Sequence, residues 1–313
     1  MNAIGVHRSS ALLSQQHSET QLETPAVQAF QHLLYTARER VAVITLNRPE
    51  RLNALGMGPG SNREELLAAL ALADSDEGVG AIVLAAAGRA FCAGGDLSGA
   101  AKRESVLDDQ LFLEAADRFH ASMRRVHKPV IAAVHGSCLG AGLWLIAACD
   151  LVVAAEDAAF GLVEGRIGLS GAGAVLHLVG PAWAKFLIWT GESIDAWRAE
   201  RIGLVLSVVP RAALEQESFE LARRIGAMPR EAVLLNKAAV DAQVEAAGLA
   251  AARAAGLPHD TATTAMARLA RAPDGRLFRD ILRDEGMEGL KRARALQYKE
   301  SWLAPGDSRS PSN

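Results

Sequence analysis

Residues Lys128–Gly161 read KPVIAAVHGSCLGAGLWLIAACDLVVAAEDAAFG, and no charged side chain occurs between Lys128 and Asp150. An apolar run of this length raises the possibility of a transmembrane helix. The composition changes along it, however: PVIAAVHG is strand-like, GAGLWLIAACD suits a helix, and LVVAAEDAAF is strand-like again. The glycine-rich break lies near the middle of the run. We therefore predict two buried strands that flank a short helix, and no membrane span.

The same alternation of strand and helix precedes this segment. Val41–Leu46 is rich in β-branched residues and predicts a strand, and SNREELLAALALADSDEG predicts a helix capped by Ser61 or Asn62. Ala81–Ala85 predicts a buried strand, and Asp108–Arg125 predicts a further helix. Strands and helices that alternate at this spacing favour an α/β fold with a mainly parallel sheet.

The chain divides into four parts by composition. We predict a disordered leader over residues 1–30, with a transit peptide as the alternative, and an α/β core over 31–230. Residues 231–302 predict a helical C-terminal segment, interrupted by an Ala-rich stretch around 245–272, and 303–313 predict a disordered tail. The helical segment is the part that we expect to serve oligomerisation.

Charge and cysteine content narrow the possible partners. The 313 residues carry a net charge of −3, which gives no basic footprint for nucleic acid. The three cysteines, Cys92, Cys138 and Cys149, have no disulfide or metal-ligand spacing. We therefore expect a cytoplasmic protein in a reducing compartment, without a metal site and without a membrane or nucleic-acid partner.

Two glycine-containing loops stand at strand-to-helix junctions: GRAFCAGGD at 88–96 and GSCLGAG at 136–142. Such junctions expose backbone N–H groups and the positive end of a helix dipole. Two converging N–H groups could form an oxyanion hole, where one donor contributes about 2.7–4 kcal/mol of transition-state stabilisation. Taken singly, each loop is weak evidence for such a site, because glycine more often serves only a turn.

Several blocks of the chain, in order, resemble the enoyl-CoA hydratase/isomerase (crotonase) superfamily. They are ITLNRPERLNAL, GRAFCAGGDL, the segment Lys128–Gly161, GRIGLSGAGAVLHLVG and TGESIDAWRAERIGLVLSVVP. The resemblance covers about residues 38–240. It implies a crotonase-type spiral of repeated ββα units with a C-terminal helical region, assembled as a homotrimer or hexamer.

The resemblance also implies an acyl-CoA thioester ligand, with coenzyme A as part of the substrate and no permanently bound cofactor. The oxyanion donors of the family map onto the backbone N–H groups of Ala93 and Ala141, the latter in place of the usual glycine. Arg51 could reach the nucleotide phosphates, or it could be an ordinary solvated side chain. The residues expected to bind substrate are Arg51, Asn53, Ala54, Asp96, Gly140 and Trp144.

The number of acidic residues available for catalysis distinguishes the possible reactions. The resemblance places one catalytic glutamate of the family at Glu164, whereas the second glutamate of the hydratases is replaced by Trp144. Addition of water needs one carboxylate to orient the water and another to supply a proton. Indole is a donor only. A single carboxylate is enough to move a double bond, so we predict an enoyl-CoA isomerase with Glu164 as its acid/base.

Three alternatives remain open. A hydratase could take its second acid from the 98–110 loop, which holds Glu104, Asp108 and Asp109. A thioester or carbon–carbon hydrolase could use Glu164 or a histidine to activate water. A degenerate member could bind acyl-CoA or a partner protein without catalysis. The acyl group is undetermined, although Trp144 and the 98–125 segment are expected to shape its pocket.

Overall fold

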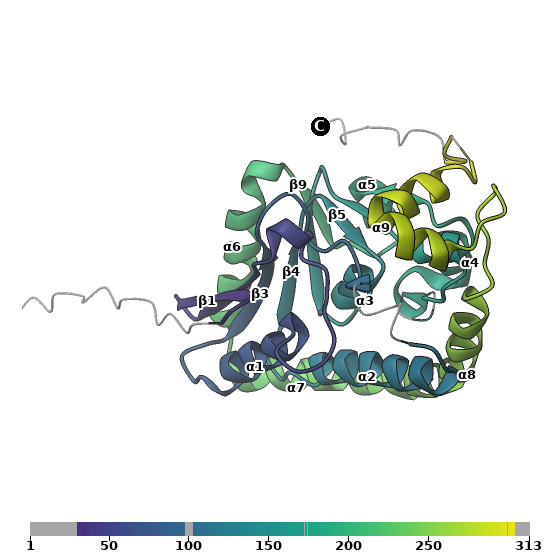
Figure 1. Cartoon of the computed structure of the whole chain (residues 1–313). Coiled ribbons are helices and arrows are strands. Elements are labelled where there is room, and N and C mark those ends of the chain that lie inside the picture. The colour runs from purple at the N-terminus through teal and green to yellow at the C-terminus, as the bar shows by residue number, and fades with distance from the viewer. Residues whose placement is uncertain (1–29, 98–102, 172, 174, 299, 304–313) are drawn as a thin grey trace, which may run out of the picture.

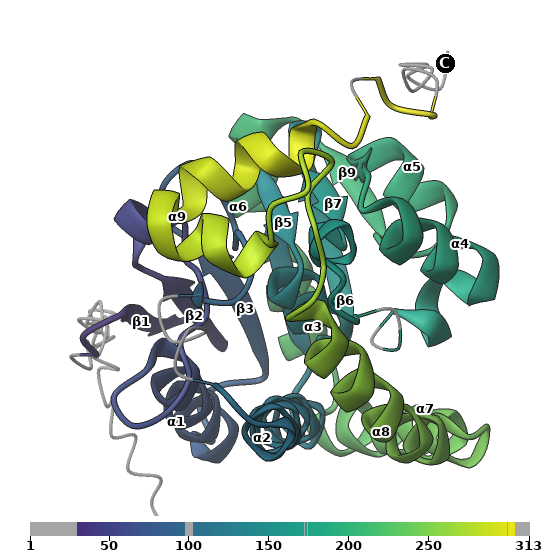
Figure 2. The same ribbon diagram turned by 45° about the vertical axis from the view of Figure 1, so that its right-hand side comes forward.

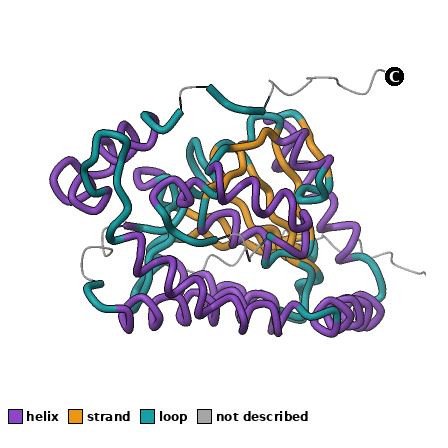
Figure 3. Tube along the Cα trace, turned by 90° about the vertical axis from the view of Figure 1, so that its right-hand side faces the viewer, coloured by secondary structure: helices purple, strands orange, loops and turns teal. Residues whose placement is uncertain are grey.

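The computed structural model describes residues 30–97, 103–171, 173, 175–298 and 300–303. The predicted leader and tail therefore lie outside the described residues, except for Phe30 and Leu303. The described part is a mixed α/β structure with strands at its centre and long helices along one side (Figure 1, Figure 3).

A six-stranded sheet forms the centre, in the order β1-β2-β3-β4-β6-β9. Its strands are β1 (Leu33–Arg38), β2 (Val41–Leu46), β3 (Ala81–Ala86), β4 (Val130–Val134), β6 (Leu151–Ala155) and β9 (Ser207–Val209). β1 and β2 form an antiparallel hairpin, and every other pairing is parallel. The prediction of a mainly parallel sheet is confirmed.

A smaller sheet carries the segments beside the glycine loops. Its order is β5-β7-β8, and its strands are β5 (Ser137–Leu139), β7 (Ala159–Gly161) and β8 (Ser193–Asp195). β5 pairs in parallel with β7, which connects the second glycine loop to the segment that precedes Glu164.

Alternate residues of each central strand enter two separate cores. In β4, Val130, Ala132 and Val134 pack toward α1 and α3, whereas Ile131 and Ala133 pack toward α6. Successive side chains of a strand point to opposite faces, and both faces are covered here. The charge-free run of the sequence is explained by this double burial. No helix within the described ranges combines the length and hydropathy that a bilayer span requires.

The first helix begins at its predicted cap, whereas the second begins two residues earlier than predicted. Ser61 accepts a hydrogen bond from the Glu64 N–H and caps α1 (Asn62–Ser75). Ser105 and Asp108 form a capping box that begins α2 (Val106–Arg124) two residues before the predicted start. The predicted helix after the second loop is α3 (Ala141–Ala147).

The C-terminal segment 231–302 is helical, as predicted, and the Ala-rich stretch that was expected to interrupt it is itself helical. The Ala-rich stretch forms α8, which packs against α2 and runs toward α9 (Figure 2). Ala is the strongest helix former, so low complexity here does not mean an irregular loop. The helices of this half are α4 (Leu176–Thr190), α5 (Ala196–Arg201), α6 (Leu214–Gly226), α7 (Arg230–Ala246), α8 (Leu249–Ala267) and α9 (Phe278–Ala295).

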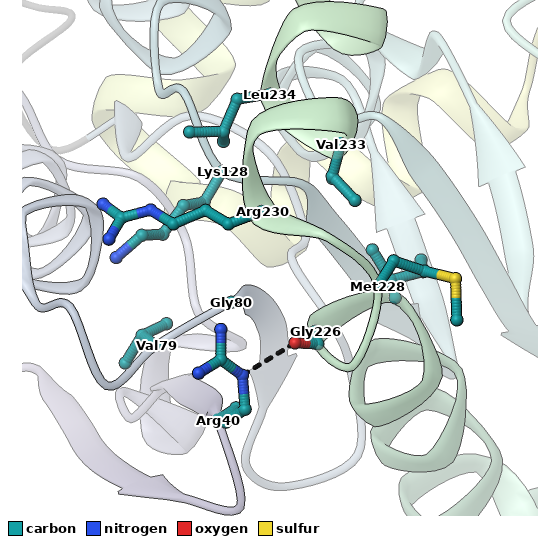
Figure 4. A pocket seen from close by; sticks show the side chains of 10 residues that line it. Arg40, Val79, Gly80, Lys128, Gly226, Met228, Arg230, Val233 and Leu234 are labelled. Carbon is teal, nitrogen blue, oxygen red and sulfur yellow. Dashed lines mark hydrogen bonds between the residues drawn. The ribbon is translucent and has the colours of Figure 1, made fainter.

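The sheet meets the end of α6 at a glycine–glycine contact. A Cβ on Gly80 would lie 2.7 Å from the Gly226 Cα and 2.9 Å from its carbonyl oxygen. Beside this contact, Arg40 Nε donates to the Gly226 carbonyl oxygen at 2.7 Å (Figure 4). The cavity that remains there is only about 10 Å³. Backbone therefore packs directly on backbone, and no side chain fits between.

We predict that Gly80→Ala lowers the free energy of unfolding by about 1–3 kcal/mol, because overpacking at a backbone contact has no flexible group to displace. Urea unfolding measures it. Gly256→Ala is the matched control, since nothing lies within 4 Å of a Cβ there and the residue is inside α8. The control should be neutral or slightly stabilising. Equal effects of the two substitutions would contradict the contact argument.

Candidate active site

A cavity of about 1830 Å³ opens between the core and the C-terminal helices. Both glycine loops, α2, α3, α8 and α9 contribute to its wall. Most of its lining area is apolar, as in a typical ligand site, and many charged side chains also border it. No cluster of three or more His, Cys, Asp or Glu side chains suited to a metal occurs among the described residues.

The first glycine loop offers its free N–H at a different residue from the predicted one. The Ala93 N–H already donates to the Leu52 carbonyl at 3.0 Å, so it is not available to a ligand. Leu52 is in the left-handed region, with φ 49°, which turns its carbonyl toward the loop. Among the described residues the Gly95 N–H has no hydrogen-bond partner, and Gly95 lines the cavity. Gly95 therefore replaces Ala93 as the candidate oxyanion donor.

The second glycine loop presents Ala141 as predicted. Ala141 is the first residue of α3, so its N–H has no partner inside the helix. Gly140 precedes it with φ 51° and ψ −116°, a conformation that favours glycine. The two loops approach closely, because a Cβ on Gly94 would lie 3.3 Å from the Leu139 carbonyl oxygen and 4.0 Å from the Ala141 nitrogen.

Glu164 lies in the short 3₁₀ helix η3 (Val163–Ile167) and its side chain faces the second loop. A Cβ on Gly140 would be 2.9 Å from Glu164 Oε2, and one on Gly171 would be 2.7 Å from Oε1. Only glycine leaves room for the carboxyl group at these two positions. Oε2 is buried and has no hydrogen-bond partner within the described part of the chain. Burial raises the pKa of Glu164 to about 7, against a smaller opposing effect of the Arg294 charge.

Trp144 lines the cavity close to this carboxyl group. It lies in α3, one turn after Ala141, and is partly buried against the core. The Cβ position on Gly171 that nearly touches Glu164 is also 3.4 Å from Trp144 Nε1. The indole N–H and the carboxyl group therefore face one small space.

The other predicted residues divide into two groups. Arg51, Ala54, Asp96 and Gly140 line the cavity, and Arg51 is exposed. Asp96 forms an ion pair with Arg48, with 3.4 Å between Asp96 Oδ2 and Arg48 Nη2. Asn53 differs from the prediction: it is fully buried and absent from the cavity wall. Its side-chain amide donates to the carbonyls of Ala87 and Ala90, so it holds the turn at Leu52 and Asn53 against the start of the first glycine loop.

The acids considered as a displaced second group are used elsewhere. Asp108 caps α2, and buried Asp109 pairs with Arg103 and Arg268. Neither lines the cavity, nor does Glu104. Residues 98–102 of that loop lie outside the described residues.

A second carboxyl group does reach the cavity from α8. Asp260 lines the wall, its pKa is raised by burial, and a hydrogen bond with Ser170 opposes that rise. The sequence analysis missed it because the Ala-rich stretch showed no helical face. An isolated acid within this Ala-rich stretch was the available signal.

Comparison with known proteins agrees with this architecture. The family model described as enoyl-CoA hydratase/isomerase matches residues 36–272. A probable enoyl-CoA hydratase of Rhizobium meliloti is 39% identical over 221 residues, covering 69% of this chain and 84% of that protein. A short-chain-enoyl-CoA hydratase of Clostridium acetobutylicum is 35% identical and covers 64% and 78%. The crystal structure of an enoyl-CoA hydratase/isomerase from Xanthobacter autotrophicus Py2 superposes with a TM-score of 0.79 at 34% identity, covering 86% of this chain and 99% of that one.

The spiral α/β fold and the paired glycine loops over one cavity define a crotonase-type protein. The chain belongs to the enoyl-CoA hydratase/isomerase family.

Proposed function

We propose that the chain is an isomerase that converts a 3-enoyl-CoA thioester into the conjugated 2-enoyl-CoA. The observation that carries this proposal is Glu164, a buried carboxyl group with a pKa near 7 beside the N–H groups of Gly95 and Ala141, which have no hydrogen-bond partner among the described residues. A base poised near the working pH combines a large ionised fraction with useful proton affinity.

The reaction needs only groups that line the cavity. The thioester oxygen accepts hydrogen bonds from the N–H groups of Gly95 and Ala141, and Glu164 removes a proton from C2. The electron pair moves onto the thioester oxygen and yields a dienolate, which the two N–H groups stabilise. The carboxylic acid then returns the same proton at C4, and the double bond lies between C2 and C3. No other reactant is consumed.

Trp144 favours this reaction over the addition of water. Its indole N–H donates hydrogen bonds but cannot remove a proton from water, and its ring occupies the space where a second carboxylate would hold the water. An incubation with 3-hexenoyl-CoA in parallel with crotonyl-CoA tests the proposal. Conversion of the first with negligible hydration of the second is the expected result, and fast hydration of crotonyl-CoA would contradict it.

We predict that kcat/KM for isomerisation rises with pH through a midpoint near 7. Burial disfavours the charged carboxylate and raises the pKa of Glu164 from 4.5 to about 7. The base therefore becomes protonated and inactive as the pH falls below that midpoint. Initial rates between about pH 5 and 9 give the profile. A midpoint close to the ordinary glutamate value would show that Glu164 is solvated and is not this base.

A hydratase is the second candidate, and Asp260 is the observation that favours it. This carboxyl group enters the same cavity from α8 and could supply the proton that Trp144 cannot. The names of two similar proteins also include hydratase. The two candidates separate on Asp260→Asn, which should abolish hydration of crotonyl-CoA in a hydratase and leave isomerisation of 3-hexenoyl-CoA largely intact in an isomerase.

A further inference from the structure

Two buried polar side chains that the proposed reaction does not use line the same cavity. Arg63 is 5% exposed and His120 is 7% exposed, and both face the cavity from the α1–α2 side. Arg63 is the second residue of α1, and His120 lies in the last two turns of α2. Polar groups of this kind are normally hydrogen-bonded when buried, so their partners need to be accounted for.

Arg63 lacks the partner that its charge requires. Its Nη1 contacts Met57 Sδ at 3.6 Å, its guanidinium lies 5.3 Å from the centre of the Phe119 ring, and its Nε has no hydrogen-bond partner. No carboxylate of the described residues forms an ion pair with it. Burial lowers its pKa to about 10.

A neighbouring arginine shows the usual arrangement. Arg253 of α8 lines the same cavity and pairs with Asp117 at 2.8 Å. The acids nearest to Arg63 in the chain are used elsewhere, because Glu64 accepts from the Gly60 N–H and Glu65 from the N–H groups of Gln31 and His32. An unpaired buried guanidinium is unfavourable, and a bound anion would remove that cost.

His120 adds a neutral donor at the same place. Burial, followed by the nearby Arg63 charge, lowers its pKa to about 3, so the ring is uncharged at neutral pH. Neither ring nitrogen makes a hydrogen bond of ordinary geometry in the described part, although the Ala116 carbonyl is close enough to influence the ring. A neutral imidazole can donate one hydrogen bond to a ligand oxygen.

The position of this pair points to the acyl end of the ligand. The His120 ring centre is 5.3 Å from that of Trp144, whose Nε1 borders the same small space beside Gly171 as the Glu164 carboxyl group. The Arg63 guanidinium acts on both His120 and Cys92, so it lies beside the first glycine loop. The pair therefore lies next to Trp144 in the cavity wall, and an acyl chain that extends from Glu164 past Trp144 would reach it.

We infer that Arg63 and His120 form a carboxylate-binding subsite, and that the preferred substrate is the CoA monothioester of an unsaturated dicarboxylic acid. The inference rests on the proposed function in one respect, namely that an acyl-CoA enters this cavity. The free carboxylate would accept two hydrogen bonds from the planar guanidinium and one from the imidazole. A plain alkyl chain would leave Arg63 buried without a counter-ion.

Binding of saturated thioesters tests the subsite without any turnover. The wild-type chain is titrated calorimetrically with adipoyl-CoA and hexanoyl-CoA, which differ only in the terminal carboxylate, and with the longer pair suberoyl-CoA and octanoyl-CoA. At one length or both, the dicarboxylic thioester should bind about 10- to 100-fold more tightly, the range expected for hydrogen bonds to a charged group. Absence of that preference at both lengths overturns the subsite.

Variants of Arg63 test whether this residue causes the preference for the dicarboxylic thioester. Arg63→Met should abolish it while binding hexanoyl-CoA at least as tightly as the wild type, and Arg63→Lys should retain part of it. Arg118→Met is the matched control, since Arg118 lies on α2 with 67% of its side chain exposed and should keep the full preference. A preference that survives Arg63→Met overturns the assignment. If Arg63→Met does not fold, the wild-type comparison and Arg63→Lys still decide the matter.

Three outcomes of these titrations separate a failure of the subsite from a failure of the proposed function. If 6-hydroxyhexanoyl-CoA binds as tightly as adipoyl-CoA, the subsite takes a neutral oxygen and the carboxylate inference fails. If none of these thioesters binds, the proposed function fails as well. Binding of both members of each pair with equal affinity refutes the subsite alone.

Discussion

Glu164→Gln should lower kcat for isomerisation of 3-hexenoyl-CoA by about 10²- to 10⁴-fold, the usual contribution of a positioned general acid/base. Glutamine keeps the size of the side chain and its place between Gly140 and Gly171, but it cannot take the proton from C2. The dissociation constant for a saturated acyl-CoA should change little, because the N–H donors remain. Steady-state rates and calorimetry measure the two quantities.

Glu231→Gln is the control for this substitution. Glu231 is exposed in the first turn of α7 and does not line the cavity. It should retain the wild-type rate. Turnover by Glu164→Gln within a few-fold of that rate would remove Glu164 from the mechanism and turn attention to Asp260.

Ala141→Pro should lower kcat by about 10²- to 10³-fold, because it deletes one oxyanion donor. Proline is well accepted at the first position of a helix, where the missing N–H has no helical partner, so α3 should still form. Circular dichroism and the thermal midpoint check the fold, and steady-state rates check the chemistry.

Ala141→Gly supplies the comparison, since it retains the N–H and changes only the side chain. Its rate should remain near that of the wild type. A similar loss in both variants would mean that the backbone shape of the second loop matters more than its N–H. The first loop would then carry the stabilisation through Gly95.

Strand and helix positions near the site were predictable because each depends on local pattern. Val41–Leu46 forms β2 at the predicted bounds, and Ser61 caps α1. The uninterrupted apolar run of β4 predicts burial on both of its faces. These features need no knowledge of distant residues.

The exact donor of the first loop was not predictable in the same way. Whether the Ala93 or the Gly95 N–H is free depends on the Leu52 carbonyl, forty-one positions earlier in the chain. The left-handed turn at Leu52 and Asn53 brings that carbonyl into place; Asn adopts a positive φ more often than most residues, but Leu rarely does. Asn53 was predicted to bind substrate because its true partners, the backbone carbonyls of Ala87 and Ala90, cannot be identified from a sequence motif.

The amino-acid composition of α8 gave no indication that this helix lines the cavity. Its polar residues Arg253 and Asp260 reach the cavity only because the helix packs across α2. A helix this rich in alanine has no distinct apolar face. The side of α8 that faces the core therefore cannot be predicted from hydrophobic periodicity.

The shared wall of the cavity has a consequence for the newly made chain. Arg51 and Glu164 emerge from the ribosome long before Lys291 and Arg294 of α9, yet all four border one cavity. The central sheet is complete at β9, about a hundred residues before the end of the chain. A nascent chain halted between these points would carry its acid and its N–H donors on an open surface, where water reaches them. The wall of the cavity is thus completed last, when translation delivers α9.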